Sequence, residues 1–220
     1  MEYNTKNSKI EVRLVQVKKF HLGPMMTNCF LAWKEDGTAY FFDCGGKNLD
    51  KLEAFVKEKQ LHMKYLILTH GHGDHIDGVH EFLKRFPQAK LYIGKEEQEF
   101  LSNPNLNLNA YISGENFEYH GEIFVVQGGD MVGEFLVLDT PGHTIGSKSF
   151  YHKDSKILMA GDTLFYHSYG RFDLPTGSQH QLVESLKKLC SLPEDTIVYN
   201  GHTEETTIGE EKEFLGFRRI

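Results

Sequence analysis

Four side chains that can bind metal ions lie within six residues of one another. His70, His72, Asp74 and His75 occur in the segment Thr-His-Gly-His-Gly-Asp-His, directly after a short apolar run. His70 and His72 are two residues apart, so in an extended chain their side chains point to the same side. Neutral imidazoles and carboxylates suit Zn(II), Fe(II) or Mn(II). The segment is therefore predicted to enclose one metal ion or two.

Two other interpretations explain this segment less well. Asp74 would serve as a helix cap beside solvated histidines, but a cap needs one residue and leaves three histidines unexplained. Gly71 and Gly73 also begin the Gly-x-Gly-x-x-Gly pattern of a phosphate-binding loop. Ile76 occupies the position of the third glycine, so the phosphate-loop interpretation fails.

Three further ligand-type side chains follow short apolar runs later in the chain. His143 follows residues 136–138, Asp162 follows residues 158–160, and His202 follows residues 196–199. A single Gly-His pair usually marks only a turn. Four strand ends of the same kind in one chain instead favour a shared site, because functional loops gather at one edge of a sheet.

The elements that must position these residues mix hairpins with strand–helix units. The stretch 103–109 is expected to be a loop, and no linker divides the chain, so we expect one domain over residues 1–220. This order predicts an α/β (α+β) fold of mixed sheets with helices outside. Periodicity and turn signals predict strands at 10–17, 29–33, 39–42, 65–68, 91–93, 117–126, 135–138, 149–152, 157–160 and 196–199. Helices are expected at 49–60, 76–86, 96–101 and 180–190.

Composition limits the class of protein. The net charge is −7, which gives no support to nucleic-acid binding. Three widely spaced cysteines argue against a disulfide scaffold and fit a reducing compartment. No secretory signal and no apolar run of about 20 residues is present, so we expect a cytoplasmic protein without a membrane span. Twelve histidines are about twice the usual number, which makes their placement the main question.

The order of these ligand-type residues resembles the metallo-β-lactamase superfamily. The run His-x-His-x-Asp-His at residues 70–75 is the most specific part, and the resemblance spans nearly the whole chain. It implies a four-layer αββα sandwich with two divalent transition metals at the edge between the sheets. Zinc is the first expectation, with iron or manganese as alternatives. The resemblance assigns His70, His72 and His143 to the first metal, Asp74, His75 and His202 to the second, and Asp162 to a bridge between them.

Further segments are similar to those of short glyoxalase II-like hydrolases, the hydroxyacylglutathione hydrolases. These are residues 23–29, 161–165, 170–175 and 200–202. The likeness implies a small thioester as the substrate. Full-length members add a C-terminal helical domain with glutathione contacts, whereas about eighteen residues follow His202 here, so we expect no such domain. The resemblance therefore supports thioester hydrolysis more than it supports glutathione as the thiol.

The predicted chemistry is attack by a metal-bound hydroxide on a carbonyl carbon. A bound metal lowers the pKa of water to about 7, and a thiolate leaves without a strong general acid. Asp74 is the candidate catalytic residue, placed to orient this water or to take its proton. Arg171 is a candidate grip for a substrate carboxylate, with an internal pair to Asp173 as the alternative. Tyr169 is expected to line the substrate pocket or simply to pack.

Supporting roles and other functions remain open at this point. Asp43 and Thr69 are candidates for holding the ligands in place, although Asp43 fits an ordinary turn equally well. A mononuclear iron persulfide dioxygenase is the second functional hypothesis, because its Gly-Arg-x-Asp loop is similar. A non-enzymatic metal-dependent binder is the third.

Overall fold

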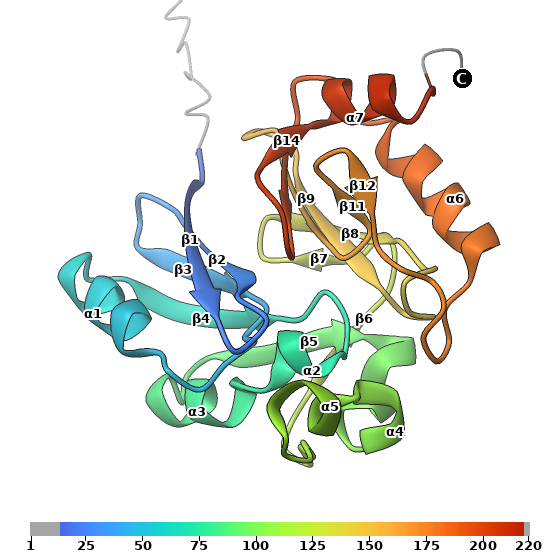
Figure 1. Cartoon of the computed structure of the whole chain (residues 1–220). Helices are drawn as coiled ribbons and strands as arrows, with labels where there is room; N and C mark the ends of the chain where they lie inside the picture. Colours follow the sequence, from blue (N-terminus) through green and yellow to red (C-terminus); the bar gives the residue numbers. More distant parts are fainter. Residues whose placement is uncertain (1–13, 218–220) are drawn as a thin grey trace, which may run out of the picture.

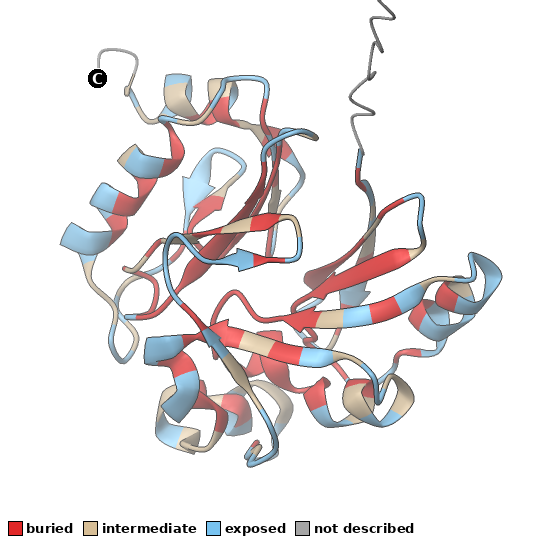
Figure 2. Cartoon of the chain, turned by 180° about the vertical axis from the view of Figure 1, so that it is seen from behind, coloured by how far each residue is buried: buried red, intermediate tan, exposed pale blue. Residues whose placement is uncertain are grey.

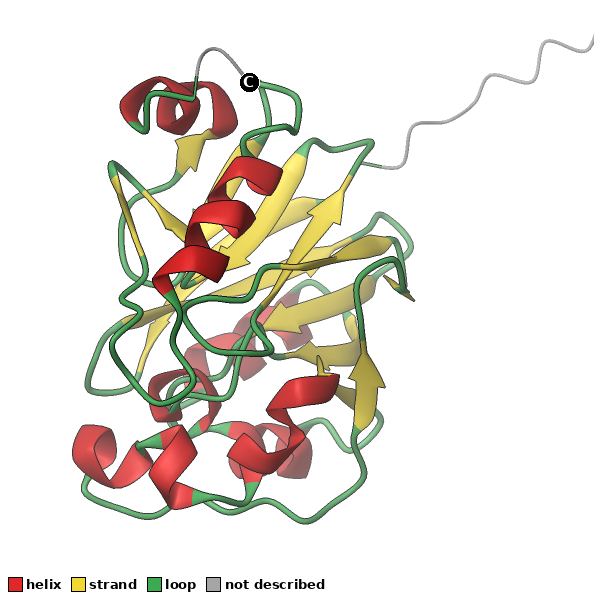
Figure 3. Ribbon diagram, turned by 90° about the vertical axis from the view of Figure 1, so that its right-hand side faces the viewer, coloured by secondary structure: helices red, strands yellow, loops and turns green. Residues whose placement is uncertain are grey.

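Two six-stranded sheets face each other, and helices cover their outer faces (Figure 1, Figure 3). The computed structural model describes residues 14–217. The first sheet has the order β1 (Gln16–Leu22), β2 (Thr27–Trp33), β3 (Thr38–Phe42), β4 (His62–Ile67), β5 (Lys90–Gly94) and β6 (Phe124–Val126). The second has the order β14 (Thr206–Thr207), β13 (Ile197–Asn200), β10 (Ile157–Gly161), β9 (Lys148–His152), β8 (Phe135–Asp139) and β7 (Met131–Val132).

Seven α-helices, one 3₁₀ helix and a small hairpin complete the described part of the chain. The hairpin pairs β11 (Leu164–Phe165) with β12 (Ser168–Tyr169). The elements on the side of the first sheet are α1 (Asp50–Glu58), α2 (Gly73–Ile76), α3 (Val79–Arg85), the 3₁₀ helix η1 (Lys95–Leu101), α4 (Pro104–Asn107) and α5 (Asn109–Ser113). Those on the side of the second sheet are α6 (Gln179–Leu189) and α7 (Ile208–Phe214).

Strand directions bring several loops to one edge of the structure. In the first sheet β1, β2 and β3 are antiparallel, whereas β3 to β6 are parallel. In the second sheet β9 is antiparallel to both β8 and β10, and β13 is parallel to β10. The strands β8, β10 and β13 therefore run in the same direction and end at the same edge. The loops that carry His143, Asp162 and His202 all begin there.

Three hydrophobic clusters fill the spaces between the layers. Strands that are buried on both faces contribute side chains to two of these clusters. Phe41 of β3 packs in the cluster under α1 and α3, while its neighbours Tyr40 and Phe42 pack between the sheets. The ring of Phe42 lies 4.9 Å from that of Phe135 and 5.7 Å from that of Phe150, across the interface between the sheets. The third cluster joins the second sheet to α6 and α7. Strands are accordingly mostly buried in Figure 2, whereas the outer helices alternate buried and exposed residues. The expected four-layer αββα arrangement is confirmed.

Several predicted elements differ from the structure. The expected loop at 103–109 contains α4 and the start of α5, because the side chain of Asn103 accepts a hydrogen bond from the N–H of Asn105 and Pro104 opens the helix. The expected helix at 76–86 corresponds to α3, which begins only at Val79, because α2 ends at Ile76. The expected strand at 117–126 is confined to β6, because the chain before it does not pair with a strand: the N–H of Tyr119 donates to the carbonyl of Leu101 at the end of η1.

The first predicted strand, at 10–17, falls partly outside the described residues. Residues 10–13 are not described, and β1 begins only at Gln16. The three cysteines are buried, unpaired thiols. Within residues 14–217, no helix combines the length and the apolar character needed to cross a membrane.

Candidate metal centre

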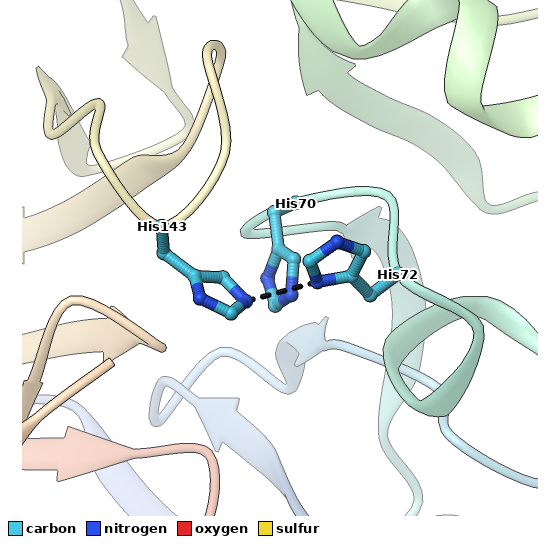
Figure 4. A group of neighbouring side chains, drawn as sticks. All are labelled: His70, His72 and His143. Carbon is cyan, nitrogen blue, oxygen red and sulfur yellow. Dashed lines mark hydrogen bonds between the residues drawn. The ribbon is translucent and has the colours of Figure 1, made fainter. Parts of the chain in front are cut away.

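The seven predicted ligand residues meet at the edge where the strands of both sheets end. His70, His72, Asp74 and His75 follow β4, and the other three follow β8, β10 and β13. Their ligand atoms form three groups, in each of which the atoms lie within 4.8 Å of one another. The groups are His70, His72 and His143; His70, His75 and Asp162; and Asp74, His75 and His202. In Figure 4 the rings of the first group point toward one another from two different loops.

The tautomer of His70 follows from a chain of hydrogen bonds. The hydroxyl of Thr69 donates to Oδ2 of Asp43 over 2.9 Å, so its proton is already used. Nδ1 of His70 lies 3.1 Å from the same hydroxyl oxygen and must therefore be the donor. The proton on Nδ1 leaves a lone pair on Nε2, which is buried and has no hydrogen-bond partner among the described residues. A metal ion is the partner that such a nitrogen fits.

His143 is oriented in a similar way by the main chain. Its Nδ1 donates to the carbonyl of Arg171 over 2.7 Å, since a carbonyl can only accept. Its Nε2 therefore presents a lone pair, and this atom lies 2.9 Å from Nδ1 of His72. At this distance the two nitrogens can share a hydrogen bond, and both can also bind one cation that lies to the side of the line joining them, since metal–nitrogen distances are about 2.0–2.1 Å.

Asp162 lies between the two sides of the cluster. Its Oδ2 is 3.2 Å from Nε2 of His202 and 3.7 Å from Nε2 of His143, while its Oδ1 is 3.3 Å from Nε2 of His75. Asp74 completes this side, with Oδ2 at 3.2 Å from Nε2 of His202. A side chain at Gly201 would place its Cβ 2.1 Å from Oδ1 of Asp162, so only glycine allows this approach.

The electrostatics of the cluster divide its histidines into two kinds. Burial and the neighbouring imidazoles lower the pKa of His70, and they lower that of His72 to about 3, so both rings are neutral ligands at physiological pH. Burial also opposes charge on His75 and His202. The attraction of the neighbouring carboxylates, above all that of Asp162, is larger than this effect of burial. It raises the pKa of His75 and brings the pKa of His202 to about 9. A divalent cation would take the place of these protons beside the carboxylates.

Asp43 contacts residues on the inner side of the cluster and has a strained backbone conformation. Its φ of 59° lies in the left-handed region, which non-glycine residues rarely occupy. Its carboxylate accepts from the N–H of Thr69 over 2.8 Å, and its Oδ2 lies 2.9 Å from Nδ1 of His75. Asp43 thus fixes both the Thr69–His70 chain and the ring of His75. The hypothesis that it supports the ligands fits this geometry better than an ordinary turn does.

A cavity of about 760 Å³ opens from the cluster to the surface. His72, Asp74, His143, Asp162 and His202 line its polar end. Its walls are mainly apolar and include Met25, Leu108, Tyr111, Ile112, Phe165 and Leu174. Apolar walls beside a polar cluster are the usual form of a small-molecule site.

The three residues predicted to contact the substrate do not all line the cavity. Tyr169 and Arg171 line it, and Asp173 does not. The guanidinium of Arg171 makes two hydrogen bonds to the carboxylate of Asp173, at 2.7 and 2.8 Å, and this contact lowers the pKa of Asp173 to about 2. The internal pair that the sequence left open is therefore present. A role for any of the three in substrate binding stays a prediction.

Sequence reasoning missed the wall formed by α4 and α5. Leu108 joins these helices with a φ of 59°, and Tyr111 and Ile112 of α5 then face the cavity. Residues 103–109 were expected to be a loop, although Asn103 followed by Pro104 is a pair that can cap and begin a helix. The segment 23–29, which was identified only by its similarity to the short hydrolases, contributes Met25 to the cavity wall.

Comparison with known proteins agrees with this geometry. The sequence profile described as the Metallo-beta-lactamase superfamily matches residues 22–202. A similar relative is the hydroxyacylglutathione hydrolase GloC of Haemophilus influenzae (strain ATCC 51907 / DSM 11121 / KW20 / Rd), 34% identical over 84% of this chain and 89% of that protein.

Two solved structures are also similar. The BLEG-1 B3 metallo-beta-lactamase superposes with a TM-score of 0.83 at 34% identity, covering 90% of this chain and 97% of that one. TTHA1623 in a di-iron-bound form superposes with a TM-score of 0.81 at 30% identity, covering 90% and 98%.

Proposed function

Because the chain belongs to the metallo-beta-lactamase superfamily, we propose that it is a metal-dependent hydrolase of small thioesters of the hydroxyacylglutathione type. The observation that carries the proposal is the position of Asp162 between two sets of histidines, at the inner end of a cavity with apolar walls. His70, His72 and His143 would hold one divalent ion and Asp74, His75 and His202 a second, with Asp162 shared. Bound there, the ions supply an activated water and an electrophile at neutral pH.

Asp74 has the position of a catalytic residue in this scheme. Its carboxylate lines the cavity, is buried, and lies 3.2 Å from Nε2 of His202 and 3.7 Å from Nε2 of His75. An ionised carboxylate here can accept a proton from water and hold its lone pair toward the substrate carbonyl. The contacts with His75 and His202 outweigh the effect of burial and lower the pKa of Asp74, which keeps it ionised for this role.

The cavity supports a thioester as the substrate. A thiolate is a good leaving group, so hydrolysis of a thioester needs no general acid. The name of the Haemophilus influenzae relative favours a hydroxyacylglutathione. Arg171, on the rim and paired with Asp173, would exchange that partner for a substrate carboxylate.

Hydrolysis of a β-lactam is a second candidate. It is favoured by the similarity to BLEG-1 over nearly the whole of both chains. A lactam nitrogen leaves less readily than a thiolate and requires a proton. Within the described residues, the cavity lining offers the hydroxyl groups of Tyr111, Ser168 and Tyr169, all outside the cluster itself.

A substrate panel on metal-loaded protein tests the proposal. Protein loaded separately with zinc, iron(II) or manganese is assayed with S-lactoylglutathione, a simpler thioester, a lactone, a cephalosporin and glutathione persulfide. The expected result is the highest kcat/KM for a thioester. Oxygen uptake with the persulfide and no thioester turnover would replace the proposal with a dioxygenase, and metal binding with no turnover of any compound would favour a binding protein.

A further inference from the structure

A fully buried glutamate lies between the two loops that carry the first group of histidines. Glu97 is part of η1, and its side chain has no solvent exposure. Carboxylates are rarely buried completely unless they are paired or accept several hydrogen bonds. Its partners therefore indicate what it does for the structure.

The two carboxylate oxygens of Glu97 hold two different loops. Oε2 accepts from the N–H of Gly71 over 2.9 Å, and Oε1 accepts from the N–H of Gly146 over 2.8 Å. Gly71 lies between His70 and His72, whereas Gly146 is three residues after His143. One side chain thus joins the histidine pair after β4 to the histidine after β8.

A second residue of η1 supports the same turn. Phe100, three residues after Glu97, is buried, and its ring centroid lies 6.1 Å from that of His72. A Cβ at Gly71 would lie 2.3 Å from Cβ of Phe100, so η1 packs directly against the backbone between the two histidines. The turn is therefore held by a hydrogen bond and by packing from one element.

We infer that Glu97 is a positioning residue that sets the spacing of His70, His72 and His143 for the first metal ion. It acts only through the loops, since its oxygens bind main-chain N–H groups and not the histidine rings. Without it the N–H groups of Gly71 and Gly146 lose their shared acceptor, and the 2.9 Å approach of His72 to His143 loses this support. The inference rests on the proposed metal site but not on the identity of the substrate.

Glu97→Gln tests this role with little change in shape. An amide keeps one acceptor oxygen but places an NH₂ group against the second main-chain donor, so one loop is released. Titration of the His202→Ala variant with Co(II) measures binding to the group of His70, His72 and His143, because His202 belongs to the other group. We expect Co(II) affinity to fall about 10- to 100-fold, as when supporting partners of metal ligands are removed, with a changed visible spectrum of the bound ion.

Two matched variants separate positioning from general stability. Glu96→Gln changes the neighbouring residue, which makes an ion pair with Lys148, and should leave Co(II) affinity unchanged. Glu211→Gln changes another fully buried glutamate, bound to Thr206 on the far side of the second sheet, and should lower the melting temperature of the metal-free protein without lowering Co(II) affinity.

Co(II) affinity of Glu97→Gln within twofold of its background, in a folded protein, would overturn the inference. If Glu97→Gln does not fold, Glu97→Asp keeps the charge but shortens the side chain by one methylene group, so its two oxygens no longer reach both main-chain donors. That variant should lower Co(II) affinity at least about threefold, and unchanged affinity would equally overturn the inference. Absence of Co(II) binding by the parent protein would instead refute the metal site itself, and so the proposed function.

Discussion

Asp43 offers a way to weaken the proposed metal centre without touching a ligand. Asp43→Asn keeps the size of the side chain, and asparagine tolerates the left-handed backbone at this position as aspartate does. The amide oxygen can still accept from the N–H of Thr69. The amide nitrogen must then face both the hydroxyl of Thr69 and Nδ1 of His75, which now contact the same carboxylate oxygen, Oδ2, at 2.9 Å.

The size of the effect follows from the contact that is lost. A hydrogen bond to a charged group is worth about 1.5–3 kcal/mol. Loss of the carboxylate behind His75 should therefore reduce metal affinity about 10- to 100-fold, the range found for partners of metal ligands. The ring of His75 loses its fixed orientation and the negative charge that balances a bound cation.

Competition with a chelator measures this effect. Zinc affinity of Asp43→Asn is compared with that of wild type and of Asp130→Asn, in which a carboxylate that accepts from the N–H of Gln127 is changed far from the cluster. We expect loss of affinity in the first variant alone, with both variants folded by thermal melting. Zinc affinity of Asp43→Asn within threefold of wild type would refute the reasoning that the support of His75 matters for metal binding.

Three further predictions concern the ligands and the core. Asp74→Ala should lower kcat at least about 10²-fold, the scale of one lost general base or positioning group, while a thermal melt shows a folded protein; near-normal turnover would contradict the mechanism. His202→Ala should weaken the second metal equivalent more than the first in a zinc titration, and equal weakening of both would contradict the division into two groups. Phe135→Ala should lower the free energy of unfolding by about 3–5 kcal/mol in urea denaturation, because its buried ring packs on Tyr40 and Phe42 between the sheets; a loss below about 1 kcal/mol would contradict the packing account.

The family and the layers could be predicted because they depend on local pattern. The His-x-His-x-Asp-His run and the apolar strands before His143, Asp162 and His202 are visible in the sequence, and parallel strand ends bring them together. The layers follow from strands such as β3, in which Ala39, Tyr40, Phe41 and Phe42 follow one another and so must be buried on both faces.

Contacts between distant segments could not be predicted in this way. Glu97 is one acidic residue in a stretch that reads as a short surface helix, and its partners Gly71 and Gly146 are 26 and 49 residues away. Leu108 has a left-handed backbone conformation that turns α5 toward the cavity, and no neighbouring residue in the sequence indicates this conformation either. Both depend on tertiary packing, which overrides local propensity.

The most direct test of the account is turnover measured against metal content. Protein stripped with a chelator is reconstituted with zinc in steps, and hydrolysis of S-lactoylglutathione is followed together with bound metal. The account predicts no turnover in the stripped protein and a rise that is complete at two equivalents per chain. Full turnover without metal, or binding that stops at one equivalent with zinc, iron(II) and manganese alike, would contradict it.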